Sequence, residues 1–184
     1  MYKQTKLGGS MTDVKWGISV KKNFSNQLTR QISENLVVAE LGRREIVATT
    51  FSGSVPDIDI LAYKNRTSIP LQVKAVKKGN LSVNAKDYLD IEFDGDKQKV
   101  KRKSGDVDRS LIFVIVYIGE QLGDEKFYIC TKGDIQDIIL EAHTTFLQKH
   151  KGVRPRQPQS THCAYNEKHL SAYKDNWQLI LDSF

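Results

Sequence analysis

The most constraining feature of the chain is an uninterrupted apolar run of eight residues, LIFVIVYI, at positions 111–118. A strand with one face in water alternates apolar and polar residues, whereas a strand covered on both faces is apolar throughout. We therefore expect residues 111–118 to form a central strand with layers of structure on both sides. A chain of 184 residues is long enough to build these layers as one domain.

Two segments have the periodicity of amphipathic helices, residues 25–43 and residues 134–150. The apolar positions that define one face of the first helix are Leu28, Ile32, Leu36 and Ala39. We expect both helices to pack their apolar faces against the sheet that contains the central strand.

Short β-branched segments predict the rest of this sheet. They are residues 45–51, 58–63, 69–77 and 126–131. The first three follow one another after short turns, which favours antiparallel pairing because a parallel connection needs more chain. The order of elements predicts an α/β fold with one mixed β-sheet, an antiparallel meander plus further strands, flanked by helices.

The charge balance favours a polyanionic partner. The chain has 28 Lys and Arg residues against 22 Asp and Glu residues, a net charge of +6 at pH 7. We expect residues 1–24 to be a basic N-terminal arm or an added strand, and residues 25–184 to be a single domain. Two loops concentrate basic residues and predict contacts to nucleic-acid phosphates, with solvated loops as the alternative. The candidate contacts are Lys97, Lys99, Lys101, Arg102, Lys103, Arg154 and Arg156.

Cysteine content and hydropathy favour a cytoplasmic protein without a membrane partner. The two cysteines, Cys130 and Cys163, are too few for a disulfide framework. No apolar run approaches the roughly 20 residues needed to span a bilayer, and no apolar secretory signal is evident. His162 beside Cys163 suggests zinc, but neither CxxC nor HxxxH spacing supports it.

Two pairs of polar residues interrupt neighbouring predicted strands. Asp57 and Asp59 are two residues apart, as are Gln72 and Lys74, so each pair points to one side of its strand. A lysine inside the apolar segment LQVKAV is costly to bury unless a carboxylate pairs with it. Antiparallel strands would bring Asp59, Gln72 and Lys74 together. The alternatives are a structural ion pair between Asp59 and Lys74, and a turn-capping role for Asp57 after Pro56.

The segments PDIDIL (residues 56–61) and PLQVKA (residues 70–75), after a helix containing SENLVVAEL, resemble the PD-(D/E)xK nuclease superfamily. Gln72 stands where the first acid of the (D/E)xK element is usual, as in the QxK variant of the superfamily. The resemblance implies a restriction-endonuclease-like core. The family also has a helix between its third and fourth core strands, and no helical pattern is obvious over residues 79–109.

The resemblance also implies roles for single residues. Asp59 matches the metal-binding aspartate and Lys74 the catalytic lysine. Glu34 matches the acid of the first helix, with Glu40 as the competing acid. The implied catalytic residues are Lys74, Asp59, Gln72 and Glu34, and the implied metal ligands are Asp59, Glu34, Gln72 and the Val73 carbonyl. Mg²⁺ or Mn²⁺ is the implied cofactor, since hard cations prefer oxygen ligands and activate water for phosphodiester hydrolysis.

The sequence thus predicts a Mg²⁺-dependent deoxyribonuclease with DNA as its partner. Its site would be acidic, with Glu34, Asp57 and Asp59 around Lys74, between basic flanks. A homodimer is plausible because cutting two strands needs two sites. Since Gln72 weakens the field for a cation, the alternative is a weak or inactive nuclease-fold protein that binds nucleic acid or a protein partner. A third class is a small-molecule or protein-interaction domain with solvated basic loops.

Overall fold

A five-stranded mixed β-sheet forms the centre of the structure, a computed structural model that describes residues 22–51, 56–105, 108–121 and 123–184. The strand order is β1-β2-β3-β7-β8. The strands are β1 (Val47–Thr50), β2 (Ile60–Lys64), β3 (Thr67–Val76), β7 (Ile112–Tyr117) and β8 (Lys126–Thr131). Only β3 and β7 pair in parallel; the other neighbours are antiparallel. The expected α/β fold with a mixed sheet and an antiparallel meander is confirmed.

β7 is the strand that the apolar run predicts. All six of its residues are buried. Ile112, Val114 and Val116 contribute to the core on one face of the sheet, and Phe113, Ile115 and Tyr117 to the core on the other face. The uniform apolar sequence therefore reflects a strand that has no solvent-facing side.

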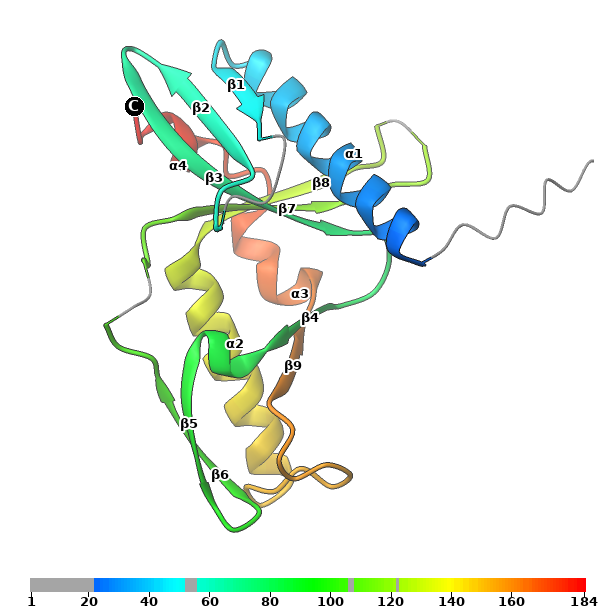
Figure 1. The fold of residues 1–184 in the computed structure, drawn as a ribbon, viewed down its shortest axis with the longest axis vertical. Helices are drawn as coiled ribbons and strands as arrows, with labels where there is room; N and C mark the ends of the chain where they lie inside the picture. Colours follow the sequence, from blue (N-terminus) through cyan, green and yellow to red (C-terminus); the bar gives the residue numbers. More distant parts are fainter. Residues whose placement is uncertain (1–21, 52–55, 106–107, 122) are drawn as a thin grey trace, which may run out of the picture.

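Helices cover both faces of the sheet. α1 (Lys22–Gly42) lies on one face and α2 (Lys132–Lys149) on the other, with α3 (Glu167–Leu170) and α4 (Gln178–Leu181) near the C-terminus (Figure 1). α1 begins inside the segment expected to be an N-terminal arm, so residues 22–24 belong to the helix; the rest of that arm lies outside the described residues. None of the described helices is long and apolar enough to cross a membrane.

The buried face of α1 differs from the expected one. Leu28 and Ile32 are 39% and 44% exposed, and the line of residues against the sheet is Thr29, Ser33, Val37 and Leu41. The hydroxyls of Thr29 and Ser33 donate to carbonyls of their own helix at 2.7 Å, so they are buried without an unpaired polar group. Apolar periodicity missed this face because its first two members are small and polar.

The connection from β3 to β7 contains strands instead of the helix that the family resemblance implies. β4 (Leu81–Asn84) and a 3₁₀ turn (Ala85–Asp87) precede the antiparallel hairpin of β5 (Leu89–Asp94) and β6 (Lys97–Arg102). β4 pairs with β9 (His162–Tyr165), a strand that is too short to show alternation. These elements surround α2 in the lower part of Figure 1.

Two buried polar side chains tie the β5–β6 hairpin to α2 and to the loop before β9. His143 is 1% exposed, and its Nε2 lies 3.0 Å from Oε1 of Gln98. The side-chain amide of Gln98 donates to the carbonyls of Pro158 and Ser160 at 2.6 and 3.0 Å. Burial, assisted by the charge of Arg154, lowers the pKa of His143 to about 4.

We predict that His143 makes the fold sensitive to acid. Its pKa is 6.5 in an unfolded chain and about 4 in the folded protein, so the unfolded state binds more protons between these values. The fold holds His143 in its neutral form, so the protein has its full stability above pH 6.5. As the pH falls towards 4, the free energy of unfolding decreases by about 2–3 kcal/mol. Urea unfolding at pH 7.5 and pH 4.5 measures this loss. The His143→Gln variant should lose less between the two pH values, and an equal loss would contradict the assignment.

Candidate functional site

Asp59 lies at the point where β2 and β3 separate. Its backbone N–H donates to the Leu71 carbonyl at 3.0 Å, and its Oδ2 accepts the Val73 N–H at 2.8 Å. The Asp59 side chain is 5% exposed. The Asp59 carboxylate therefore accepts the Val73 N–H in the way that a main-chain carbonyl would if the pairing of β2 and β3 continued. The Val73 carbonyl, proposed from the sequence as a ligand, points to this same edge of β3.

Gln72 and Lys74 flank Val73 on β3 and face the same side of the sheet. Val73 and Ile60 pack in the core beneath α1. Since side chains alternate along a strand, Gln72 and Lys74 point to the opposite face. Asp59 precedes the first residue of β2, and its carboxylate lies between the strands, where it binds the Val73 N–H and Arg30 of α1. Gln72 and Lys74 therefore share one face of β3, and Asp59 is bound to the backbone of the residue between them.

Lys74 is a partly buried cation beside this carboxylate. Its Nζ lies 5.8 Å from the ring centroid of Phe113. It also lines a cavity of about 450 Å³ together with Asp87 and Tyr88. Burial lowers the pKa of the Lys74 ammonium, and the negative charge of Asp59 partly opposes this shift. The fold thus keeps a lysine where its charge is poorly solvated.

Arg30 of α1, which the sequence did not single out, joins two of the predicted acids. Its Nε donates to Glu34 Oε1 at 2.7 Å, and its Nη2 donates to Asp59 Oδ1 at 2.5 Å. The bond to Glu34 and the negative charges of both acids raise the pKa of Arg30. Arg30, and not Lys74, is therefore the ion-pair partner of Asp59, which corrects the alternative of a structural pair between Asp59 and Lys74.

The competing helix acid lies elsewhere on α1. Glu40 accepts from Arg43 and Arg44, each at 2.7 Å. Arg44 in turn stacks over the ring of Trp177 at 4.3 Å. Glu34 is thus the acid of α1 that the structure joins to Asp59, while Glu40 belongs to the packing of the C-terminal segment.

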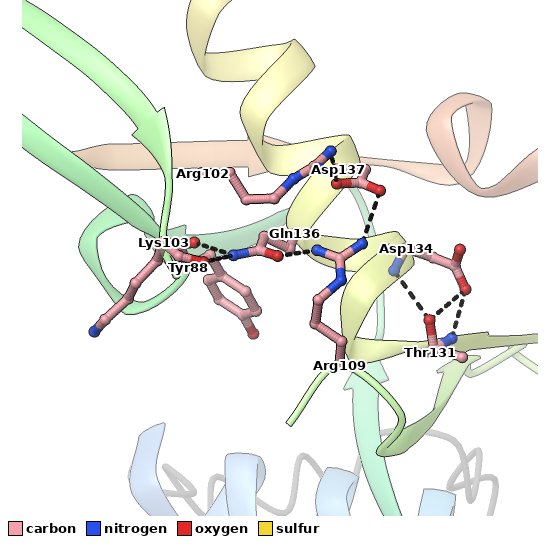
Figure 2. Close-up of polar contacts among 8 residues, drawn as sticks. All are labelled: Tyr88, Arg102, Lys103, Arg109, Thr131, Asp134, Gln136 and Asp137. Carbon is pink, nitrogen blue, oxygen red and sulfur yellow. Dashed lines mark hydrogen bonds and ion pairs between the residues drawn. The ribbon is translucent and has the colours of Figure 1, made fainter. Parts of the chain in front are cut away.

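A second lysine reaches the site from the start of α2. Thr131 and Asp134 form a capping box that begins this helix (Figure 2). Lys132 follows the cap, and its Nζ lies 3.9 Å from Asp57 Oδ2. Asp57 has a positive φ of 61° and a side chain that is 64% exposed, which fits a turn residue better than a buried ligand.

The site is more balanced in charge than the sequence predicts. Its three carboxylates face three cations, Arg30, Lys74 and Lys132, instead of a single lysine. Among the described residues, no group of three or more His, Cys, Asp or Glu side chains is placed to hold a metal ion. Two carboxylates with neutral oxygens nearby still suit Mg²⁺, which is usually held by one or two carboxylates plus water. In this conformation the Arg30 guanidinium binds both of these carboxylates, Glu34 and Asp59.

A buried glutamine on α2 holds the segment beside the Lys74 cavity. Figure 2 shows Gln136, which is 0% exposed, between α2 and the ends of the β5–β6 hairpin. Its amide nitrogen donates to the carbonyls of Tyr88 and Lys103 at 2.8 and 2.9 Å. Its amide oxygen accepts from Arg109, which also pairs with Asp137 at 3.1 Å. One side chain thus fixes Tyr88, which lines the same cavity as Lys74.

We predict that Gln136→Leu lowers the free energy of unfolding by about 2–4 kcal/mol. The leucine would leave one buried carbonyl, one partly buried carbonyl and the Arg109 guanidinium without this partner, and unpaired buried polar groups each cost about 1–3 kcal/mol. Urea denaturation measures the change. Gln148→Leu, an exposed position on the same helix, should change it by less than about 0.5 kcal/mol. Equal effects of the two substitutions would show that the network contributes little.

The predicted phosphate contacts of the hairpin face acidic residues. Lysines on β6 are exposed and lie directly opposite acids on β5. The opposed pairs are Lys97 with Asp94, Lys99 with Glu92, and Lys101 with Asp90. Lys99 also binds Asp94 at 2.9 Å, and Arg102 binds Asp137 at 2.6 Å. Lys103 follows the strand, and its carbonyl accepts from Gln136. The acids offset much of the positive charge, and phosphate contact by these residues stays a prediction.

Arg154 and Arg156 lie in the loop between α2 and β9. The Arg154 guanidinium stacks on Phe146 at 4.9 Å and donates to the His162 carbonyl at 2.5 Å. Arg156 is exposed. Phosphate contact by these two arginines also stays a prediction.

The chain matches no protein-family model and no curated protein. Its structure is similar to the solved structure of a bacterial homing endonuclease, I-Ssp6803I, with 16% sequence identity and a TM-score of 0.46. The similarity covers 86% of this chain and 95% of the endonuclease chain. A similarity at this level does not assign a function to the chain.

Proposed function

We propose that this protein is a metal-dependent DNA endonuclease that hydrolyses phosphodiester bonds. The observation that supports the proposal is the bond between Asp59 and the Val73 N–H, on the residue between Gln72 and Lys74, with Glu34 joined to Asp59 through Arg30. The sequence resemblance to the QxK variant of the PD-(D/E)xK nucleases supports the same reading. The proposed cellular location is the cytoplasm, and a homodimer would supply a site for each strand.

Each residue would have a distinct part in the reaction. Asp59 and Glu34 would hold Mg²⁺ or Mn²⁺, with the Gln72 side-chain oxygen and the Val73 carbonyl as neutral ligands. When bound, such an ion lowers the pKa of water and neutralises charge on the phosphate. Lys74 would donate hydrogen bonds that orient the attacking water or stabilise the negative charge that develops on the phosphate. Because its ammonium is partly desolvated, these bonds would be stronger than those of a surface lysine.

A second candidate function is nucleic-acid binding without cleavage. Two observations favour it: Gln72 replaces a carboxylate, and Arg30 already neutralises Glu34 and Asp59. An arginine in the place of a metal ion would stabilise the fold without activating water. Binding would then depend on the basic surfaces alone and would weaken as salt increases.

A cleavage assay separates the two functions. Supercoiled, linear and branched DNA are incubated with the full chain in Mg²⁺ or Mn²⁺, with EDTA as the metal-free control. Nicking that requires the metal and disappears in Asp59→Asn supports the endonuclease. Salt-sensitive binding with no nicking of any substrate would establish the second function instead.

A further inference from the structure

The end of α2 and the loop that leads to β9 carry basic side chains that have no acidic partner within the described part of the chain. Lys149, Lys151, Arg154 and Arg156 form none of the ion pairs found there. The hairpin lysines, by contrast, lie opposite acids. The positive charge available to a polyanion is therefore greater at the end of α2 than on β6.

Two of these cations, Lys149 and Arg154, line a cavity. A space of about 440 Å³ between α2 and β9 is lined by Lys149, Arg154, His162 and His169, with Glu141 as its one carboxylate. A second space of about 450 Å³ shares Arg154 as a wall and adds Arg156. Both are large enough for a phosphate group with its ester substituents.

Arg154 is held ready for a ligand. Its guanidinium stacks on Phe146, whose other contact is the ring of His150 at 4.7 Å. One of its nitrogens donates to the His162 carbonyl. Its other N–H groups form no ion pair with a carboxylate of the described residues. Burial keeps the neighbouring His143 neutral at pH 7, since its pKa is about 4. A half-buried arginine with no acidic partner among the described residues would gain charge-assisted hydrogen bonds from an anion.

We propose that the cavity between α2 and β9 binds a phosphate group of a nucleic-acid strand, with Arg154 and Lys149 as its main cations. The choice of nucleic acid rests on the proposed function; the anion chemistry rests on the cavity. α2 rises about 1.5 Å per residue, so Lys149 lies about 26 Å along the helix from Lys132 at the candidate site. A phosphate held here would be a contact separate from the one that is cleaved.

Binding in EDTA tests this proposal without cleavage. A fluorescein-labelled 24-base-pair duplex is titrated with the full chain at several salt concentrations. Lys149→Glu and Arg154→Gln should each weaken binding at least fivefold and reduce the salt slope by about one. Lys174→Glu is the matched control, because it makes the same charge change at an exposed lysine away from the cavity, and it should stay within about twofold. Thermal unfolding checks that each variant is folded.

A lysine-acylation footprint gives an independent readout. The duplex should protect Lys149 and leave Lys174 reactive. Equal binding by Lys149→Glu and Lys174→Glu, or an unprotected Lys149, would overturn the proposal. Metal-dependent nicking that survives such a result would leave the endonuclease intact. Conversely, cavity-dependent binding with no nicking would retain the cavity and reject the endonuclease.

Discussion

Replacing Lys74 by methionine should lower DNA cleavage by at least about 10²–10³-fold, the cost of removing one donor to a developing negative charge. Methionine has nearly the shape of the lysine stem and removes the ammonium, which lies 5.8 Å from the centroid of the Phe113 ring. Rates of nicking of supercoiled DNA in Mg²⁺, measured beside duplex binding in EDTA, separate catalysis from binding. The affinity for the duplex should change little, because the cations without an acidic partner lie at the end of α2 and in the loop before β9, away from Lys74.

The same substitution should raise, and not lower, the free energy of unfolding at pH 7. Burial lowers the pKa of Lys74, so the folded state holds this charge less favourably than the unfolded state does. The penalty applies at neutral pH and disappears as the pH rises through the folded pKa towards the usual lysine value. A protein that becomes more stable as it loses activity has a lysine kept for chemistry.

Lys78→Met is the matched control for this experiment. Lys78 is exposed just beyond the end of β3, so its replacement should leave nicking within about twofold and stability within about 0.5 kcal/mol. Nicking by Lys74→Met at the wild-type rate would remove Lys74 from the catalytic residues. A fall in stability would indicate that its charge has a structural partner.

The sheet could be predicted from the sequence because its strands carry strong local signals. The run from Leu111 to Ile118 can be satisfied only by a strand covered on both faces, and β7 is that strand. The spacing of Gln72 and Lys74 likewise predicts their common face, because side chains alternate along a strand. β9 escaped prediction because its four residues are defined by pairing with β4, a long-range contact.

The charges around the site could not be predicted in the same way. In the sequence Arg30 has the pattern of an exposed helix residue, and only the approach of α1 to the start of β2 brings it to Asp59. The lysines of β6 form a dense basic run in the sequence, yet register with β5 places an acid opposite each of Lys97, Lys99 and Lys101. The charge that a partner meets is that of one surface, and it depends on which strands and helices lie side by side. The amino-acid composition does not contain this information.

Replacing Arg30 by methionine should raise the affinity for Mn²⁺ at least tenfold while it destabilises the metal-free protein by about 2–3 kcal/mol. Arg30 binds both Glu34 and Asp59, whose side chains are only 12% and 5% exposed, so its loss leaves two poorly solvated carboxylates without a cation. A divalent ion would then bind them without displacing the guanidinium. Arg30 itself is 51% exposed, which leaves room for it to swing outwards when a metal binds the wild type.

Calorimetric titration with Mn²⁺, together with the rise in melting temperature at saturating Mn²⁺, tests this exchange without reference to cleavage. Arg43→Met is the matched control, since it removes an exposed ion pair with Glu40 on the same helix and should change neither quantity appreciably. If Arg30→Met binds Mn²⁺ no better than the wild type, the guanidinium does not compete for the site. If Arg30→Met binds Mn²⁺ better and nicks DNA faster than the wild type, Arg30 restrains the nuclease. If it binds Mn²⁺ better and does not nick DNA, Gln72 is the residue that limits cleavage. Its neutral side-chain oxygen then stands where a third carboxylate is needed to hold the ion in position for the reaction.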